Sequence, residues 1–114
     1  MSDTGPPGFP SAGDLQQALD LFRAQFTQSL PARMTAVQEQ LQACRAAPSD
    51  DEPLRALHRL VHGLAGSAGT FGLPEFGAAC KAIEGQLDGL LERGARSRGD
   101  FDEVDAALAA LPQP

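Results

Sequence analysis

The sequence has no tryptophan, no tyrosine and only one lysine, Lys81, and its formal net charge is −6. It therefore lacks the basic patch with which proteins bind nucleic acid or anionic membranes, and we expect neither as a partner. No apolar run approaches the roughly 20 residues that span a bilayer. No basic segment followed by an apolar stretch opens the chain, so we see no secretory signal and expect a cytoplasmic protein.

Cysteine is also scarce. The two that are present, Cys44 and Cys80, fall at apolar positions of helical patterns. Such positions favour buried, reduced thiols over a disulfide or a metal site.

Signals for β-strands are few. No segment alternates apolar and polar residues, and hairpin pairs such as Asn-Gly are absent. Apolar residues instead recur every three or four positions in five segments, and we assign these stripes to the core. The sequence thus predicts an all-α fold, an antiparallel four-helix bundle with an additional N-terminal helix.

Glycine, proline and capping residues divide the chain into three parts. The Gly- and Pro-rich residues 1–13 predict a flexible tail, residues 14–111 the bundle, and residues 112–114 a C-terminal tail. Asp14 is expected to cap the first helix. Pro31 is expected to separate it from a second helix, and one kinked helix is the alternative.

Four further boundaries are predicted downstream. Ser49 or Asp50 should cap the helix that carries both histidines, and Gly72 should end it in a left-handed conformation. Pro74 suits the first turn of the next helix, and Asp100 should cap the last one.

Both histidines lie in a glycine-rich helical stretch. A helical wheel predicts an apolar face formed by Leu57, Leu60, Leu64 and Phe71. His62 falls on the opposite side, surrounded by His58, Ala65, Gly66 and Gly69. Three glycines inside the helix would cost roughly 3 kcal/mol, so a compensating role is expected. We expect Gly66 and Gly69 to clear space around His62, and Gly63 to let a neighbouring helix pack closely.

A histidine in this setting offers nucleophilic chemistry at neutral pH. One ring nitrogen can attack phosphorus while the other keeps its proton and is held by an acceptor. Glu75 and Glu84, on the following helix, are the acidic candidates, and Glu84 flanks that helix's apolar stripe.

The stretch from His62 to Gly72, followed by Ala-Ile-Glu ending at Glu84, resembles the histidine-containing phosphotransfer (HPt) domain family. The positions that match the family's signature are His62, Leu64, Gly66, Ser67 and Gly72. The resemblance covers about residues 14–111, and its specific part is residues 58–84.

The resemblance implies that His62 is the phosphoacceptor of a two-component phosphorelay. It would carry a phosphoryl group between receiver-domain aspartates, as a phosphocarrier rather than a self-sufficient kinase. Glu84 would hydrogen-bond the histidine ring, and Gly66 would permit close approach of the partner. The implied partners are response-regulator receiver domains and a hybrid histidine kinase, with the chain acting as a monomer. It would hold no cofactor, since the receiver supplies Mg²⁺.

The chain departs from the family at Ala65, where members usually have lysine. Arg59, Arg55 or Lys81 could replace that positive charge. The departure also motivates an alternative function, a non-catalytic HPt-like module that binds a receiver or kinase without efficient transfer.

Two other polar residues of this stretch have simpler interpretations. We expect His58 to be a surface or packing residue that shapes the site, and Ser67 to make a structural hydrogen bond to backbone rather than act as a nucleophile. His58 and His62 also have the spacing of a metal-binding pair, so a metal-binding bundle is a third hypothesis. No third ligand is evident, and we predict no metal site.

Overall fold

The computed structural model describes residues 11–113, and helices form nearly all of this part. They are α1 (Ala12–Ala46), α2 (Asp51–Thr70), α3 (Pro74–Arg93), a 3-10 helix (Arg98–Phe101) and α4 (Asp102–Ala109). The described residues contain no strand, which confirms the all-α prediction. Residues 1–10 and 114, which include most of the two predicted tails, lie outside the described part.

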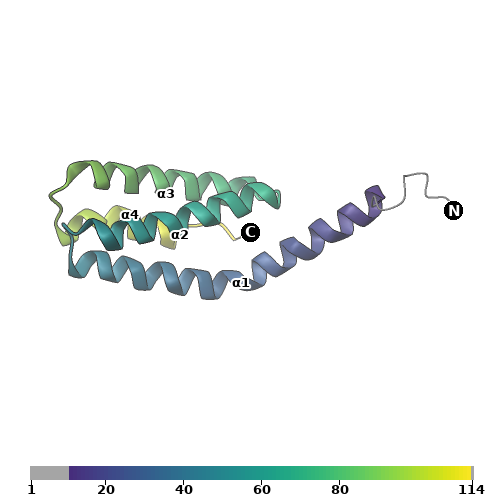
Figure 1. Cartoon of the computed structure of the whole chain (residues 1–114), viewed down its shortest axis with the longest axis horizontal. Coiled ribbons are helices and arrows are strands. Elements are labelled where there is room, and N and C mark those ends of the chain that lie inside the picture. Colours follow the sequence, from purple (N-terminus) through teal and green to yellow (C-terminus); the bar gives the residue numbers. More distant parts are fainter. Residues whose placement is uncertain (1–10, 114) are drawn as a thin grey trace.

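Four helices form the bundle, and each runs against the next along the chain (Figure 1). α2 and α3 lie side by side, the C-terminal half of α1 packs against α2, and α4 covers α3. The largest side chains that are fully buried between these helices include Leu41, Leu54, Leu57, Leu64, Ile83, Leu87 and Phe101. The core is therefore aliphatic with a few phenylalanines, as the lack of tryptophan and tyrosine requires.

The predicted break at Pro31 is wrong, because α1 continues through this residue as one helix. Proline inside a helix removes one hydrogen bond and costs about 3 kcal/mol. Core packing on both sides outweighs that cost: Leu30 and Val37 are buried, and Phe26 contacts the ring of Phe71 at 5.6 Å between centroids. The single bent helix that was the alternative is the structure observed (Figure 1).

The start of α1 also differs from the prediction. Ser11, not Asp14, is the N-cap, and Asp14 is the third helical residue of a capping box in which each side chain bonds the other's backbone amide. The helix therefore begins at Ala12, inside residues 1–13, which had been predicted to be a flexible tail.

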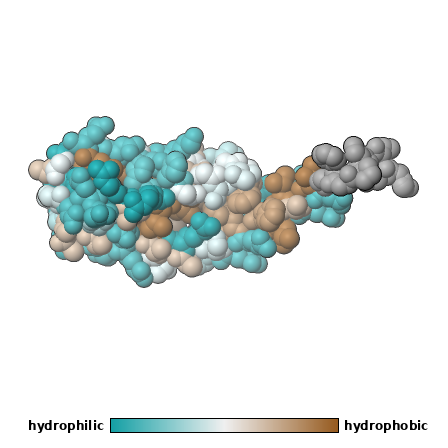
Figure 2. Space-filling model, in the orientation of Figure 1, coloured by the Kyte–Doolittle hydropathy of each residue, from teal (hydrophilic) through white to brown (hydrophobic). Residues whose placement is uncertain are grey.

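The N-terminal part of α1 projects beyond the end of the other helices (Figure 1). Its apolar stripe was expected in the core, but Leu15, Leu19 and Phe22 are between 41% and 52% exposed. Figure 2 shows apolar side chains along this projection. The predicted stripe is real, but no helix of the described chain lies opposite its first half.

The predicted start and end of α2 and the predicted start of α3 are confirmed. Asp50 caps α2 through its bond from the Glu52 amide, at 3.0 Å. Gly72 has a φ of +70°, the left-handed value that ends the helix, and Pro74 is the first residue of α3. This tight turn holds α2 and α3 antiparallel and thereby fixes which of their residues face each other.

The connection from α3 to α4 is held by a buried arginine that the sequence did not reveal. Arg96 donates to the carbonyls of Pro48 and Leu90 at 2.7 and 3.0 Å, and to Asp51 Oδ1 at 2.7 Å. Ser97, rather than the predicted Asp100, caps the 3-10 helix that precedes α4. These bonds tie the α3–α4 connection to the α1–α2 loop.

Both cysteines are buried and free, as expected for reduced thiols. Burial raises the pKa of Cys44 and of Cys80 to about 11. Across the described residues, none of the helices combines the length and the apolar character needed to cross a membrane.

Candidate functional site

The buried face of α2 is rotated relative to the predicted one. Leu60, placed in the core by the wheel, is 37% exposed, whereas Leu54 and Val61 are fully buried. The wheel assumed a single apolar face pointing at one neighbour, but α2 packs between α1 and α3. His62 therefore does not lie opposite the core. It lies at the border with α3, and this position brings it to Glu84.

His62 is held by one carboxylate and is otherwise open. Its Nδ1 lies 2.8 Å from Oε2 of Glu84, which projects from α3. The His62 side chain is 72% exposed and that of Glu84 only 17%. A carboxylate only accepts hydrogen bonds, so in the neutral imidazole Nδ1 carries the proton and Nε2 has the free lone pair. The other acidic candidate, Glu75, is exposed in the first turn of α3.

His58 lies one turn before His62, with its ring nearly parallel to that of His62 at 6.3 Å. Its Nε2 lies 2.9 Å from Oδ1 of Asp88 and 3.9 Å from Oε2 of Glu84. The Asp88 contact is at ion-pair distance without the alignment of a hydrogen bond, and Nε2 has almost no accessible surface. His58 thus packs into the same site as His62, but its buried nitrogen faces carboxylates rather than solvent.

The glycines around His62 leave the surface beside it free of side chains. A Cβ added at Gly66 or Gly69 would meet nothing within 4 Å, and both residues are exposed. The same is true of Gly63, so the expectation that it admits a neighbouring helix is wrong. Gly77 of α3 has that role, since a Cβ there would lie 3.2 Å from Cβ of Ala68. Close packing of α2 and α3 thus depends on a glycine that the sequence did not single out.

Ala65 belongs to the interface between α2 and α3. The helical wheel had placed it on the exposed surface around His62. It is only 6% exposed, because α3 covers this side of α2. Of the three cations that could replace a lysine here, Arg55 lies 3.6 Å from Asp51. Lys81 and Arg59 are exposed, and neither forms an ion pair with another described residue.

Ser67 is half-buried, and its hydroxyl makes no hydrogen bond to a described residue, so the predicted structural bond is not formed. Its backbone carbonyl accepts from the Phe71 amide at 3.0 Å, which closes the last turn of α2. Within residues 11–113, no group of three or more His, Cys, Asp and Glu side chains is arranged to hold a metal ion.

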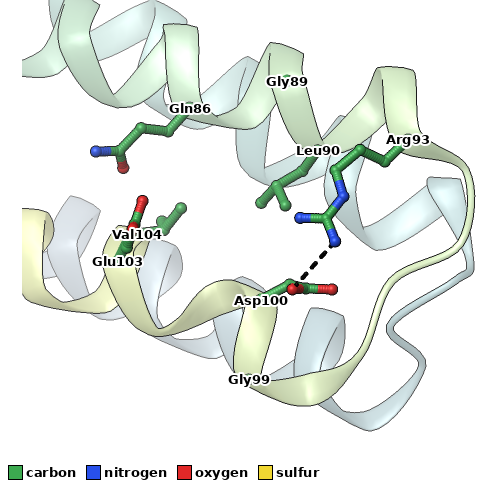
Figure 3. A pocket seen from close by; sticks show the side chains of 8 residues that line it. All are labelled: Gln86, Gly89, Leu90, Arg93, Gly99, Asp100, Glu103 and Val104. Atoms are coloured by element: carbon green, nitrogen blue, oxygen red, sulfur yellow. Dashed lines mark ion pairs between the residues drawn. The ribbon is translucent and has the colours of Figure 1, made fainter.

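An open hollow lies between α3 and the 3-10 helix and α4, away from these residues (Figure 3). Its lining residues are Gln86, Gly89, Leu90, Arg93, Gly99, Asp100, Glu103 and Val104. Arg93 spans its mouth to Asp100 at 3.3 Å. It contains none of the predicted site residues, and the exposed side chain of His62 lies outside it.

Asp88 is the site residue that the sequence analysis missed. It lies four residues after Glu84, so both carboxylates occupy one face of α3. That spacing was a usable signal, but only the antiparallel register of α2 and α3 shows that the pair faces both histidines.

Comparison with known proteins identifies the family. The Hpt domain family model matches residues 21–113, which is most of the chain. No curated protein and no solved structure matched the chain. The match begins within α1 and includes the whole of α2 and α3. The chain therefore belongs to the Hpt domain family, whose members perform histidine phosphotransfer in two-component systems.

Proposed function

We propose that His62 carries the phosphoryl group in a phosphorelay, receiving it from one receiver aspartate and passing it to another. The observation that supports this most strongly is the fixed orientation of an exposed imidazole. Nδ1 is held at 2.8 Å by Glu84 on a ring that is 72% exposed, which leaves Nε2 available for an incoming group.

The chemistry is a reversible exchange of one bond for another. The lone pair of Nε2 attacks phosphorus, the N–P bond forms, and the bond from phosphorus to the aspartyl oxygen breaks to release a carboxylate. Nδ1 keeps its proton throughout, and Glu84 stabilises the positive charge that the ring acquires. The reverse step returns the phosphoryl group to a receiver. The Mg²⁺ that assists this transfer would come with the receiver.

The two histidines differ in access, and this favours His62 over His58. The His58 side chain is 25% exposed, and its Nε2 faces Asp88 and Glu84. A phosphoryl group at that nitrogen would meet two carboxylates of like charge. At His62 the neighbouring surface is formed by Gly66 and Gly69, where no side chain obstructs the approach of a receiver.

A phosphoryl group on His62 adds negative charge beside Glu84, and a cation is needed nearby. His58 faces Asp88, His62 faces Glu84, and Ala68 meets Gly77, so the antiparallel register sets Lys81 opposite Ala65. Lys81 would thus supply from α3 the charge that the family places on α2. Arg59, exposed on α2 one turn before His62, is the second candidate.

This assignment of the cation can be tested by removing one charge at a time. Lys81→Ala or Arg59→Ala is expected to slow phosphoryl transfer. Arg98→Ala is a matched control, because it removes one exposed positive charge at the far end of the bundle. Rates that are normal in both Lys81→Ala and Arg59→Ala would exclude this role for either residue.

The function itself is tested by incubating the protein with phosphorylated receiver domains from the genome that encodes it. We expect acid-labile, base-stable label on the bundle and none on His62→Gln. Receiver binding without label on the wild type would favour the alternative, a non-catalytic interaction module. Label undiminished in His62→Gln would contradict the proposal.

A further inference from the structure

Two carboxylates lie on one face of α3 with an imidazole nitrogen beside both of them. Glu84 and Asp88 are four residues apart, a spacing at which like charges on a helix destabilise each other. His58 Nε2 lies 2.9 Å from Asp88 and 3.9 Å from Glu84. The oxygen of Glu84 nearest to His58, Oε2, is the same atom that contacts Nδ1 of His62.

The proton on His58 follows from its neighbours. Both carboxylates only accept hydrogen bonds, so the tautomer of His58 that suits them carries its proton on the buried Nε2, although this N–H is not aligned as a hydrogen bond to either one. The positive end of this N–H lies within 4 Å of an oxygen of each carboxylate and attracts both of them. Without this N–H, repulsion from Asp88, whose side chain is 60% exposed, would move the carboxylate of Glu84 away from His62.

We propose that His58 is a positioning residue for the site of His62. Its Nε2–H offsets the repulsion between Glu84 and Asp88, and so keeps Glu84 on Nδ1 of His62. The consequence for transfer rests on the proposed function of His62. The positioning itself does not, because the tautomer of His62 can be measured in the unphosphorylated protein.

Three variants separate this role from simple packing. His58→Leu fills the space but removes the N–H, and His58→Gln restores a donor near the position of Nε2. The double variant His58→Leu/Asp88→Asn removes both the donor and the charge that it offsets. If His58 only filled space, the loss caused by His58→Leu would not be reversed by removing the charge of Asp88 on α3.

The measurement is ¹⁵N NMR of the His62 ring at pH 8, with thermal denaturation to confirm that each variant is folded. In the wild type and in His58→Gln we expect the Nδ1–H tautomer to predominate. In His58→Leu we expect a shift toward Nε2–H, the form that a histidine side chain prefers in water. The double variant should regain most of the Nδ1–H population.

Two results would overturn the proposal: an unchanged His62 tautomer in His58→Leu, or a double variant no closer to wild type than His58→Leu. A several-fold lower phosphorylation rate in His58→Leu, recovered in the double variant, would extend the result to function. If His62 proved not to accept phosphate, the tautomer data would still decide whether His58 positions Glu84.

Discussion

Two glycines on facing helices should respond differently to the same substitution: the change to alanine should stabilise the protein at one of them and not at the other. In helix interiors, Gly→Ala stabilises by about 1 kcal/mol, because glycine loses more backbone entropy on folding. Gly63 of α2 has space for a methyl group, since an added Cβ meets nothing within 4 Å. We therefore expect Gly63→Ala to gain that full amount and to raise Tm by about 4 °C.

Gly77→Ala starts with the same gain but meets a neighbour. Its Cβ would lie 3.2 Å from Cβ of Ala68, and α2 and α3 would have to separate by a few tenths of an ångström. Overpacking of this kind costs about 1–3 kcal/mol, so the net effect is between neutral and about 2 kcal/mol of destabilisation. Both helices hold parts of the site, so we also expect the His62–Glu84 contact to weaken in this variant.

Urea denaturation of both variants beside the wild type is the assay, with the free energy of unfolding taken at constant m. Gly66→Ala adds a functional arm: it should be as stabilising as Gly63→Ala, yet slow transfer from a receiver by placing a methyl group beside His62. Equal stabilisation by Gly63→Ala and Gly77→Ala would refute the packing argument.

Three further predictions concern the rest of the bundle. Arg96→Ala should destabilise by about 3 kcal/mol in urea denaturation, because it leaves the buried carbonyl of Leu90 and the half-buried carbonyl of Pro48 without their donor. The hydrogen bond from Arg96 lowers the pKa of Asp51, so the stability that this bond adds at neutral pH is lost as the pH falls through the acid range. Asp51→Asn should therefore reduce the fall in the free energy of unfolding at acid pH. An unchanged pH dependence in this variant would contradict the assignment. Since burial raises the pKa of Cys44 and Cys80 to about 11, both thiols should react with iodoacetamide at pH 8 only as fast as the protein opens, and rapid labelling of the folded protein would exclude their burial.

The sequence predicted the helical class and the turn at Gly72 because these depend on local signals. Apolar spacing and a left-handed glycine act within a few residues of the chain. Pro31 shows the limit of such reasoning, since a local cost of about 3 kcal/mol was outweighed by packing of Phe26 and Leu30 against distant segments. The exposed stripe at the start of α1 shows the converse, an apolar pattern for which the described chain supplies no partner.

Within the site, the pairing of His62 with Glu84 followed from the resemblance and from the position of Glu84 beside an apolar stripe. The role of Asp88 and the burial of Ala65 could not be predicted in this way. Both depend on the rotation of α2 about its axis and on its register with α3. A helical wheel of α2 alone gives neither this rotation nor this register.

The most direct test of the account is to identify the nitrogen that becomes phosphorylated. The protein can be treated with phosphoramidate, a small donor that requires no receiver, and examined by ³¹P and ¹⁵N NMR. Because Nδ1 of His62 is held by Glu84 at 2.8 Å, the account predicts one phosphoryl group, on Nε2 of His62, with Nδ1 still protonated. Phosphate on His58, or on Nδ1 of His62, would contradict it.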